Sequence, residues 1–245
     1  NPDTIEKIKN MRKLLVVTPV KDSIFHAEQA IRSVMKNNNG QWNYVVYDDF
    51  SSDETSARLD ELSDELGFQV VHLRNILNTP SPNYRYVLQT IQRKALQENS
   101  HVVLVESDVV VNDNTFLQLS SAVTDNIGLV AAVTIDEQGV VNFPYLFARK
   151  WKSRDVLTKK RLSFCCTLLT NNFLRSYDFA ALDPTKNWYD VFISHKSIEL
   201  GFKNILQMTN QVIHHPHSSR PWKLLKYTNP LKYYWIKYTK GFDKI

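Results

Sequence analysis

Glycine is scarce in this chain, with six residues among 245. The positions are Gly40, Gly67, Gly128, Gly139, Gly201 and Gly241. None of them forms a Gly-x-Gly pattern or a phosphate-binding P-loop, so the fingerprints of dinucleotide-cofactor proteins and of Walker-type ATPases are missing. A nucleotide bound by this chain must therefore be held through a metal ion and side chains.

Cysteine is rarer still, and long hydrophobic runs are missing. The two cysteines, Cys165 and Cys166, are neighbours. Neighbouring side chains of a strand point to opposite faces, so these two are poorly placed to pair, which favours a reducing cytosol. No apolar run approaches the length of a membrane-spanning helix, and the N-terminus lacks a signal-peptide core. We therefore expect a cytoplasmic protein, bound at most peripherally to the inner face of the membrane.

The chain is rich in alternating strand and helix patterns. Its 43% hydrophobic and 11% aromatic content is typical of a globular protein with a substantial core. The patterns predict strands at residues 14–17, 44–47, 70–73, 102–105 and 129–133, and helices at 25–35, 51–66, 84–97 and 114–123. Further on they predict a strand at 164–169, a helix at 188–200 and short strands at 205–206 and 211–213. This order predicts an α/β fold with a mainly parallel central sheet flanked by helices.

Two of the predicted strands end in acidic residues. Asp48 and Asp49 follow one strand, and Glu106 and Asp108 follow another. Ligands of open α/β sheets bind beyond the carboxyl ends of the strands. Asp48 and Asp49 suit hydrogen bonds to a base or a ribose, or else they favour the adjacent helix N-terminus. Glu106 and Asp108 lie two residues apart, hence on one side of the strand, and suit Mg²⁺ or Mn²⁺; a solvated turn is the alternative.

Two further features suggest chemistry. Asp190 lies at the start of a predicted helix, where the helix N-terminus stabilises an ionised proton acceptor, although ordinary first-turn acids are common. His214, His215 and His217 form the densest histidine cluster. An imidazole there could complete a metal site built mainly from carboxylates, and a polar loop is the alternative.

The segment 220–245 is basic and aromatic. It holds seven Lys or Arg and one acid, so it carries +6 and leaves −1 for the rest of a chain whose net charge is +5. Lysines among Trp and Tyr suit an anionic membrane surface. They also suit nucleic acid, the weakest of the interpretations, so we expect no nucleic-acid partner. The third interpretation is a terminal helix packed on the body of the protein with its lysines in water.

Five segments in a fixed order resemble the family 2 glycosyltransferases, whose domain has the GT-A fold. Residues 14–22 are similar to their opening strand, and residues 47–55 to their Asp-Asp-Gly-Ser-x-Asp-x-Thr segment. Residues 106–108 occupy the place of the Asp-x-Asp metal motif. Residues 189–193 with 201–202 resemble the Glu-Asp-x-Asp-Leu…Gly-Tyr/Trp segment, and residues 212–214 the closing Val-x-His. The similarity covers about residues 13–217.

The chain departs from the family pattern at several positions. Phe50 replaces the usual glycine, and Glu106 replaces the first aspartate of the metal motif. Tyr189 and Phe192 stand where acids are common. The Gln-x-x-Arg-Trp motif of processive members is missing, which indicates transfer of a single sugar.

The resemblance implies an inverting, metal-dependent transfer from a nucleotide-diphospho-sugar, for which we expect a UDP-sugar, to a hydroxyl of a glycan or lipid-linked acceptor in cell-surface polysaccharide synthesis. Glu106 and Asp108 would hold Mg²⁺ or Mn²⁺ with help from His214, and Asp190 would accept the proton of the acceptor hydroxyl. The implied donor-site residues are Thr18, Pro19 and Asp49 around the nucleoside, Asp48 nearby, Arg85 at the diphosphate or sugar, and Ser107.

The resemblance also implies a division of the chain. Residues 1–219 would form the GT-A domain, with a nucleotide-sugar half at 13–110 and an acceptor half at 111–219, followed by the extension at 220–245. Two other functions stay open. A sugar nucleotidyltransferase of related fold is disfavoured because residues 18–22 contain no glycine. A non-catalytic sugar or polyanion binder of the same fold draws support from the missing acid near Asp190.

Overall fold

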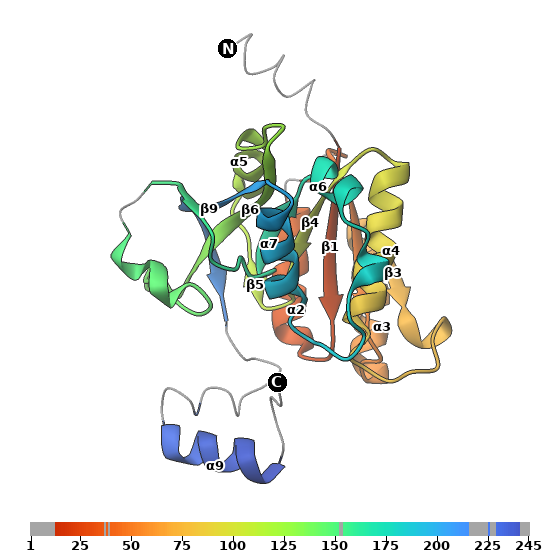
Figure 1. The fold of residues 1–245 in the computed structure, drawn as a ribbon. Helices are drawn as coiled ribbons and strands as arrows, with labels where there is room; N and C mark the ends of the chain where they lie inside the picture. Colours follow the sequence, from red (N-terminus) through yellow and green to blue (C-terminus); the bar gives the residue numbers. More distant parts are fainter. Residues whose placement is uncertain are drawn as a thin grey trace.

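One nine-stranded mixed sheet organises the protein. The computed structural model describes residues 13–36, 38, 40–151, 154–215, 225 and 229–240 (Figure 1). The strands lie in the order β3-β2-β1-β4-β8-β6-β9-β5, and β7 pairs with β9. The predicted α/β class with helices flanking the sheet is confirmed.

The bounds of the elements follow the predicted alternation. The strands are β1 (Leu14–Val20), β2 (Trp42–Asp48), β3 (Gln69–His72), β4 (His101–Val105), β5 (Val109–Val110), β6 (Ile127–Ile135), β7 (Val156–Thr158), β8 (Cys166–Leu169) and β9 (Lys203–His214). The α-helices are α2 (Ile24–Met35), α3 (Asp53–Leu66), α4 (Tyr84–Gln97), α5 (Thr115–Ser121), α6 (Asn171–Ser176), α7 (Tyr189–Glu199) and α9 (Pro230–Lys240). Short 3₁₀ helices occur at η1 (Leu73–Asn75), η2 (Leu146–Lys150) and η3 (Phe179–Ala181).

Six strands share one direction. The strands β1, β2, β3 and β4 pair in parallel, and so do β6 and β9. Because β8 is antiparallel to both β4 and β6, the two groups run the same way. The apolar runs of β1 and β4 are buried on both faces, as expected for a parallel sheet covered by helices. Val87 and Ile91 of α4 pack in the core on one face, and Ile31 of α2 and Leu59 of α3 pack in the core on the other. The mainly parallel sheet is therefore held between two hydrophobic layers.

Antiparallel pairing then brings the second half of the chain to the ends of the first strands. β8 pairs with β4 so that Val105 lies opposite Cys166, and the Glu106 amide donates to the Cys165 carbonyl at 2.9 Å. β5 pairs with β9 so that Val109 lies opposite His214. The acidic end of β4 is thus flanked by residues 165 and 214, which are far away in the sequence.

Several local predictions need correction. The two short strands expected at 205–206 and 211–213 are one strand, β9, whose register on β6 shifts because residues 208–210 have no partner there. The strands β5 and β7 were not predicted, since segments of two and three residues carry no readable period. Helix α3 is capped by Ser52, not by Ser51, whose hydroxyl instead accepts a hydrogen bond from the Asp22 amide at 2.9 Å.

Close packing between β6 and α7 depends on Gly128. A Cβ atom at this position would lie 2.1 Å from Ser197 Oγ and 3.0 Å from the Cβ of Phe202. Only a residue without a side chain allows the helix to approach the strand this closely. Among the helices that the structure describes, none is both long enough and apolar enough to cross a membrane.

Candidate active site

Asp48 at the end of β2 is enclosed by donors. Its Oδ1 accepts from the Ser51 amide at 3.0 Å, and its Oδ2 accepts from Ser56 Oγ at 2.6 Å and lies 2.7 Å from His72 Nδ1. Burial alone would raise the pKa of Asp48, but the hydrogen bonds from Ser56, His72 and Ser51 lower it. The side chain therefore ties β2 to α3 and β3 as a buried carboxylate, and its predicted place near the nucleoside stays a prediction.

Asp49 fixes the loop that leads into α4. Its Oδ2 accepts from Ser81 Oγ at 2.8 Å and from the Asn83 amide at 2.9 Å, and its Oδ1 accepts from Asn83 Nδ2 at 2.7 Å. Asn83 is followed directly by Tyr84, the first residue of α4. Asp49 thus fixes the loop from which α4 and its first residue, Tyr84, begin.

The turn after Asp49 explains the family's glycine. Phe50 has a φ of 61°, in the left-handed region that a bulky side chain rarely adopts. A glycine would adopt this conformation without steric cost. The ring of Phe50 instead packs partly buried against the core around α4. The departure at this position therefore changes the side chain while the backbone keeps the conformation that glycine favours.

The remaining predicted donor residues are spread around the strand ends. Thr18 is fully buried in β1 and accepts a hydrogen bond from the Tyr44 hydroxyl at 2.9 Å, while Pro19 is half-buried. Arg85 donates to the carbonyl oxygens of Leu182 at 2.7 Å and Ala180 at 3.1 Å. These contacts give Thr18 and Arg85 structural partners, and their donor-binding roles stay predictions.

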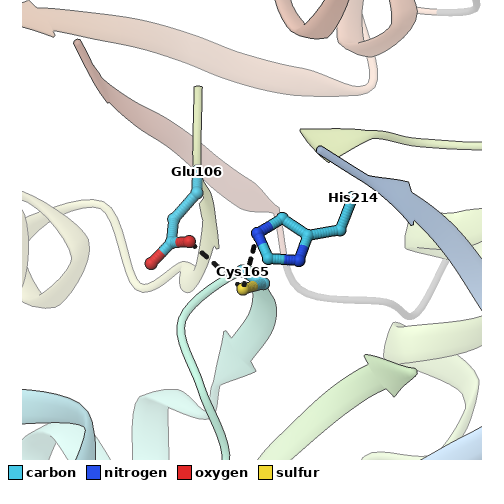
Figure 2. Close-up of side chains that lie close together, drawn as sticks. All are labelled: Glu106, Cys165 and His214. Atoms are coloured by element: carbon cyan, nitrogen blue, oxygen red, sulfur yellow. Dashed lines mark hydrogen bonds between the residues drawn. The ribbon is translucent and has the colours of Figure 1, made fainter. Parts of the chain in front are cut away.

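A second cluster lies at the end of β4. Glu106, Cys165 and His214 each offer one ligand atom, and these atoms lie within 4.8 Å of one another. Figure 2 shows the three side chains converging from β4, from the approach to β8 and from the end of β9. Cys165 Sγ donates to Glu106 Oε2 at 3.1 Å and lies 3.9 Å from His214 Nε2. The half-buried Asp108 joins them, with its Oδ1 3.6 Å from His214 Nε2, and the half-buried Ser107 lies between the two acids in sequence.

The hydrogen bonds of His214 define which nitrogen is available. Nδ1 lies 2.6 Å from the Phe143 carbonyl oxygen, which can only accept, so Nδ1 carries the proton. Burial lowers the pKa of His214, against an opposing effect of the nearby Asp108. The neutral ring therefore turns the lone pair of Nε2 toward the acids, which is the arrangement of a metal-ligating histidine held by a backbone carbonyl.

The electrostatics of the cluster favour a cation. Burial and the nearby charge of Asp108 raise the pKa of Glu106 to about 7, and the charge of Asp190 adds to this, whereas the Cys165 hydrogen bond and Arg161 oppose it. Crowded carboxylates that resist ionisation are stabilised when a positive ion lies among them. Carboxylate oxygens with one imidazole suit Mg²⁺ or Mn²⁺, so the residues present fit the predicted metal.

Asp190 lies in the first turn of α7, beside this cluster. Its Oδ1 accepts from the Val191 amide at 2.9 Å, and its Oδ2 accepts from the Arg161 guanidinium at 2.6 Å. Burial and the charges of Glu106 and Asp190 raise the pKa of Tyr84 well above its usual range. The charges of both acids therefore act on Tyr84, which directly follows Asn83, the residue that Asp49 holds.

The structure thus brings Glu106, Asp108, Asp190 and His214 into one neighbourhood. His215 points elsewhere, because its ring stacks on His26 with 4.9 Å between centroids, and His217 lies outside the described residues. Two surface hollows lie away from the acids: one of about 460 Å³ between α4 and the region of α6, and one of about 890 Å³ beside β2, α3 and β3.

Two residues of this neighbourhood were missed from the sequence. Cys165 lies in a segment whose only readable signal was an apolar strand pattern, and Arg161 lies in a stretch without a period. The signal that identifies them is the antiparallel return of β8 beside β4, which no local pattern reveals.

A model of glycosyl transferase family 2 matches residues 16–179, about two thirds of the chain. The chain belongs to glycosyl transferase family 2. The resemblance seen in the motifs is therefore confirmed, and the matched range includes Asp49, Glu106, Asp108 and Cys165. A comparison with curated proteins found no match.

Solved structures show the same fold. A crystal structure of GalNAc-T7 with UDP, GalNAc and Mn²⁺ is 16% identical with a TM-score of 0.62, covering 84% of this chain and 44% of that one. The mannosyltransferase PcManGT from Pyrobaculum calidifontis, with GDP-Man and Mn²⁺, is 16% identical with a TM-score of 0.61, covering 93% and 64%. S. aureus TarS 1–349 is 15% identical with a TM-score of 0.62, covering 88% and 64%. This chain thus spans about half to two thirds of the length of these structures, all of which share its fold.

Proposed function

We propose that this protein is an inverting, metal-dependent glycosyltransferase that moves one sugar from a nucleotide-diphospho-sugar to a hydroxyl of a glycan or lipid-linked acceptor. The observation that carries the proposal is the convergence of Glu106, Asp108 and the Nε2 lone pair of His214 beside Asp190. Glu106, Asp108 and His214 would hold Mg²⁺ or Mn²⁺. When bound, such a cation offsets the negative charge that develops on a leaving diphosphate.

Asp190 is the base in this proposal. An acceptor hydroxyl that attacks the sugar on the face opposite the diphosphate must lose its proton, and a carboxylate at hydrogen-bond distance accelerates this step about 10²- to 10⁴-fold. Arg161 holds one oxygen of Asp190, which fixes the orientation of the carboxylate. The Tyr84 ring, which lies beside the rings of Phe164 and Tyr189, adds apolar surface near these acids.

The donor base is the least defined part of the proposal. We expect a UDP-sugar, although the similar structures named above contain UDP in one case and GDP-Man in another. Asp49, through the loop that it holds, would position the side chains that meet the nucleoside, together with Phe50 next to it in the chain and Pro19 on the neighbouring strand β1. A thermal-shift screen of UDP-, GDP- and CDP-sugars, each with and without Mn²⁺, identifies the donor, because a ligand that binds the folded state raises the melting temperature.

The direct test combines Asp190→Asn with an assay of donor consumption. We expect transfer to fall about 10²- to 10⁴-fold while the donor-induced shift in melting temperature stays unchanged. Asp125→Asn, at an exposed position, is the matched control and should keep full activity. If Asp190→Asn transfers sugar at the normal rate, Asp190 is not the base. If the wild type binds a donor but neither transfers nor hydrolyses its sugar with Mn²⁺ present, the non-catalytic binder is the better description.

The basic extension supports a second part of the proposal, contact with an anionic membrane surface. Of its residues, the structure describes 225 and 229–240, and α9 exposes Leu231, Trp235 and Tyr238 at 86%, 65% and 84%. Exposed aromatic and apolar side chains on a helix that also carries lysines suit a lipid headgroup layer. Co-sedimentation with phosphatidylserine vesicles should weaken with salt and with Lys232→Glu, but not with Lys186→Glu in the body. Equal binding to neutral vesicles would reject the electrostatic part.

A further inference from the structure

Cys165 occupies the centre of the proposed metal site, where the sequence motifs assign no residue. Its side chain is 1% exposed and directly precedes β8. The sulfur lies 3.1 Å from Glu106 Oε2, 3.9 Å from His214 Nε2 and 3.4 Å from Ser163 Oγ. The thiol therefore lies next to two groups that would bind a cation, Glu106 and His214, and next to the Ser163 hydroxyl. Figure 2 shows the first two beside the sulfur.

We propose that Cys165 is itself a ligand of the divalent cation, and that this sulfur raises the affinity of the site for Zn²⁺, Co²⁺ or Cd²⁺ relative to its affinity for Mg²⁺. The proposal rests on the metal site of the proposed function and deepens it. Thiolate is a soft ligand that Mg²⁺ avoids and that Zn²⁺ and Cd²⁺ favour. A site made only of carboxylates and imidazole would favour these ions over Mg²⁺ by a smaller margin, because it lacks the soft sulfur ligand.

The spacing of the three ligand atoms fits this role. In a tetrahedral zinc site with Zn–S of about 2.3 Å and Zn–N of about 2.0 Å, a sulfur and a nitrogen ligand lie about 3.6 Å apart. The observed separation between Cys165 Sγ and His214 Nε2 is 3.9 Å, and the separation between Sγ and Glu106 Oε2 is 3.1 Å. Small rotations of the three side chains would therefore bring them around one ion.

Binding of the cation would exchange the thiol proton of Cys165 for a metal–sulfur bond. In the metal-free protein the neutral thiol donates its proton toward Glu106. When the cation binds, the S–H bond breaks, the proton leaves to solvent, and the sulfur lone pair forms the bond to the metal. The cation thus takes the place of the thiol proton beside the same carboxylate, and the added negative charge of the thiolate is offset by the ion.

The neighbouring Cys166 provides a matched control. It is equally buried and lies in β8, opposite Val105. Burial alone raises the pKa of the Cys166 thiol. The pKa of the Cys165 thiol is raised by burial and also by the negative charges of Glu106 and Asp108. Replacing either sulfur by oxygen is a change of the same size in the same local structure, so a difference between the two variants reports on the metal site.

The test uses Co²⁺ and Zn²⁺ as probes of the wild type, Cys165→Ser and Cys166→Ser. We expect wild type and Cys166→Ser with Co²⁺ to show a sulfur-to-cobalt charge-transfer band, and X-ray absorption of the Zn²⁺ form to show a sulfur at about 2.3 Å. Cys165→Ser should lack both signals while still binding the metal. By calorimetry its affinity for Zn²⁺ or Cd²⁺ should fall at least about tenfold, with the Mg²⁺ affinity changed less than about threefold.

The outcomes separate this proposal from the one on which it rests. Bound cobalt without a sulfur band in the wild type, or an identical band in Cys165→Ser, overturns the thiolate ligand, and metal-dependent donor binding would then still support the transferase site. If neither the wild type nor a variant binds any divalent cation, both proposals fail. Circular dichroism and melting temperature confirm that each variant is folded before its spectrum is interpreted.

Discussion

At the end of β2, every carboxylate oxygen of Asp48 and Asp49 accepts a hydrogen bond from the protein, whereas at the end of β4 Glu106 receives one from a thiol and lies near the charges of Asp108 and Asp190. The consequence appears in the pKa values. That of Asp48 is lowered, and that of Glu106 is raised to about 7. Each of these two acids has a second acid close to it in the sequence at the end of a buried strand, yet their surroundings shift the pKa of Asp48 and that of Glu106 in opposite directions.

This difference distinguishes carboxylates that the fold supplies with hydrogen-bond donors from carboxylates that lie close to one another's charges. A carboxylate that the fold supplies with donors stabilises the fold and has little to gain from a ligand. A group of acids that repel one another reduces stability in the metal-free protein and gains most from a bound cation. Substitutions at the end of β2 should therefore mainly reduce the free energy of unfolding, and substitutions at the end of β4 should mainly reduce activity.

The largest expected effect is on transfer. Asp108→Asn removes one ligand of the proposed metal site, and we expect the rate of sugar transfer to fall about 10²- to 10⁴-fold, which corresponds to losing several kcal/mol of charge stabilisation at the diphosphate. Because the substitution also removes a repelling charge, the free energy of unfolding without metal should stay the same or rise. Steady-state transfer with Mn²⁺ and urea unfolding without it measure the two effects. A strong loss of stability in Asp108→Asn would contradict the distinction between the clusters.

Asp48→Asn should show the reverse pattern. It replaces a buried acceptor with an amide that meets the donors of Ser51, Ser56 and His72, so we expect the free energy of unfolding to fall by about 3 kcal/mol. Urea unfolding measures the change, and residual transfer at a temperature where the variant is folded should stay near that of the wild type. Asp53→Asn is the control: its side chain is 95% exposed, and its ion pair with Arg74 should be worth at most about 1 kcal/mol. If Asp48→Asn is as stable as this control, the buried network does not act as described.

The third expected effect is the pH dependence of stability. The raised pKa of Glu106 means that the folded protein binds more protons than the unfolded chain between about pH 4.3, the ordinary value for glutamate, and about pH 7. Stability of the metal-free protein should therefore decrease as the pH rises through this window. The lowered pKa of Asp48 acts in the other direction, because its contribution is lost only as the pH falls below about 4.

Glu106→Gln isolates this effect. The variant should be more stable than the wild type at pH 8, and the difference should disappear as the pH approaches about 4. Differential scanning calorimetry across this range gives the two curves. Added Mn²⁺ should stabilise the wild type at pH 8 and the variant much less. Parallel curves for the two proteins would show that Glu106 titrates normally.

Most of the fold could be predicted from the sequence. Helix α4 has the predicted bounds, residues 84–97, because its apolar spacing is regular and the prolines before it exclude an earlier start. The strands β1, β2 and β4 were located because runs buried on both faces are continuous and apolar. What could not be predicted were β5, β7 and the continuity of β9, since these depend on pairing between segments far apart in the sequence.

The same limit applies to the site. Glu106 and Asp108 were recognisable because two acids follow a strand in period-2 spacing, and His214 because it closes an apolar run in the family's order. Cys165 and Arg161 carry no local signal, because their roles depend on β8 returning antiparallel beside β4. Phe50 shows the converse: the motif comparison flagged it, and its φ of 61° shows why glycine is usual there.

The absent side chain at Gly128 sets how closely α7 packs against β6. Asp190 opens α7, and α7 rests against β6 at the depth that Gly128 permits. A single methyl group there would clash with Ser197 and Phe202, lift the C-terminal half of α7 from β6 and so tilt the helix whose first turn holds Asp190. A survey of inactive variants would therefore find position 128 alongside the acids, although no atom of Gly128 need ever meet a substrate.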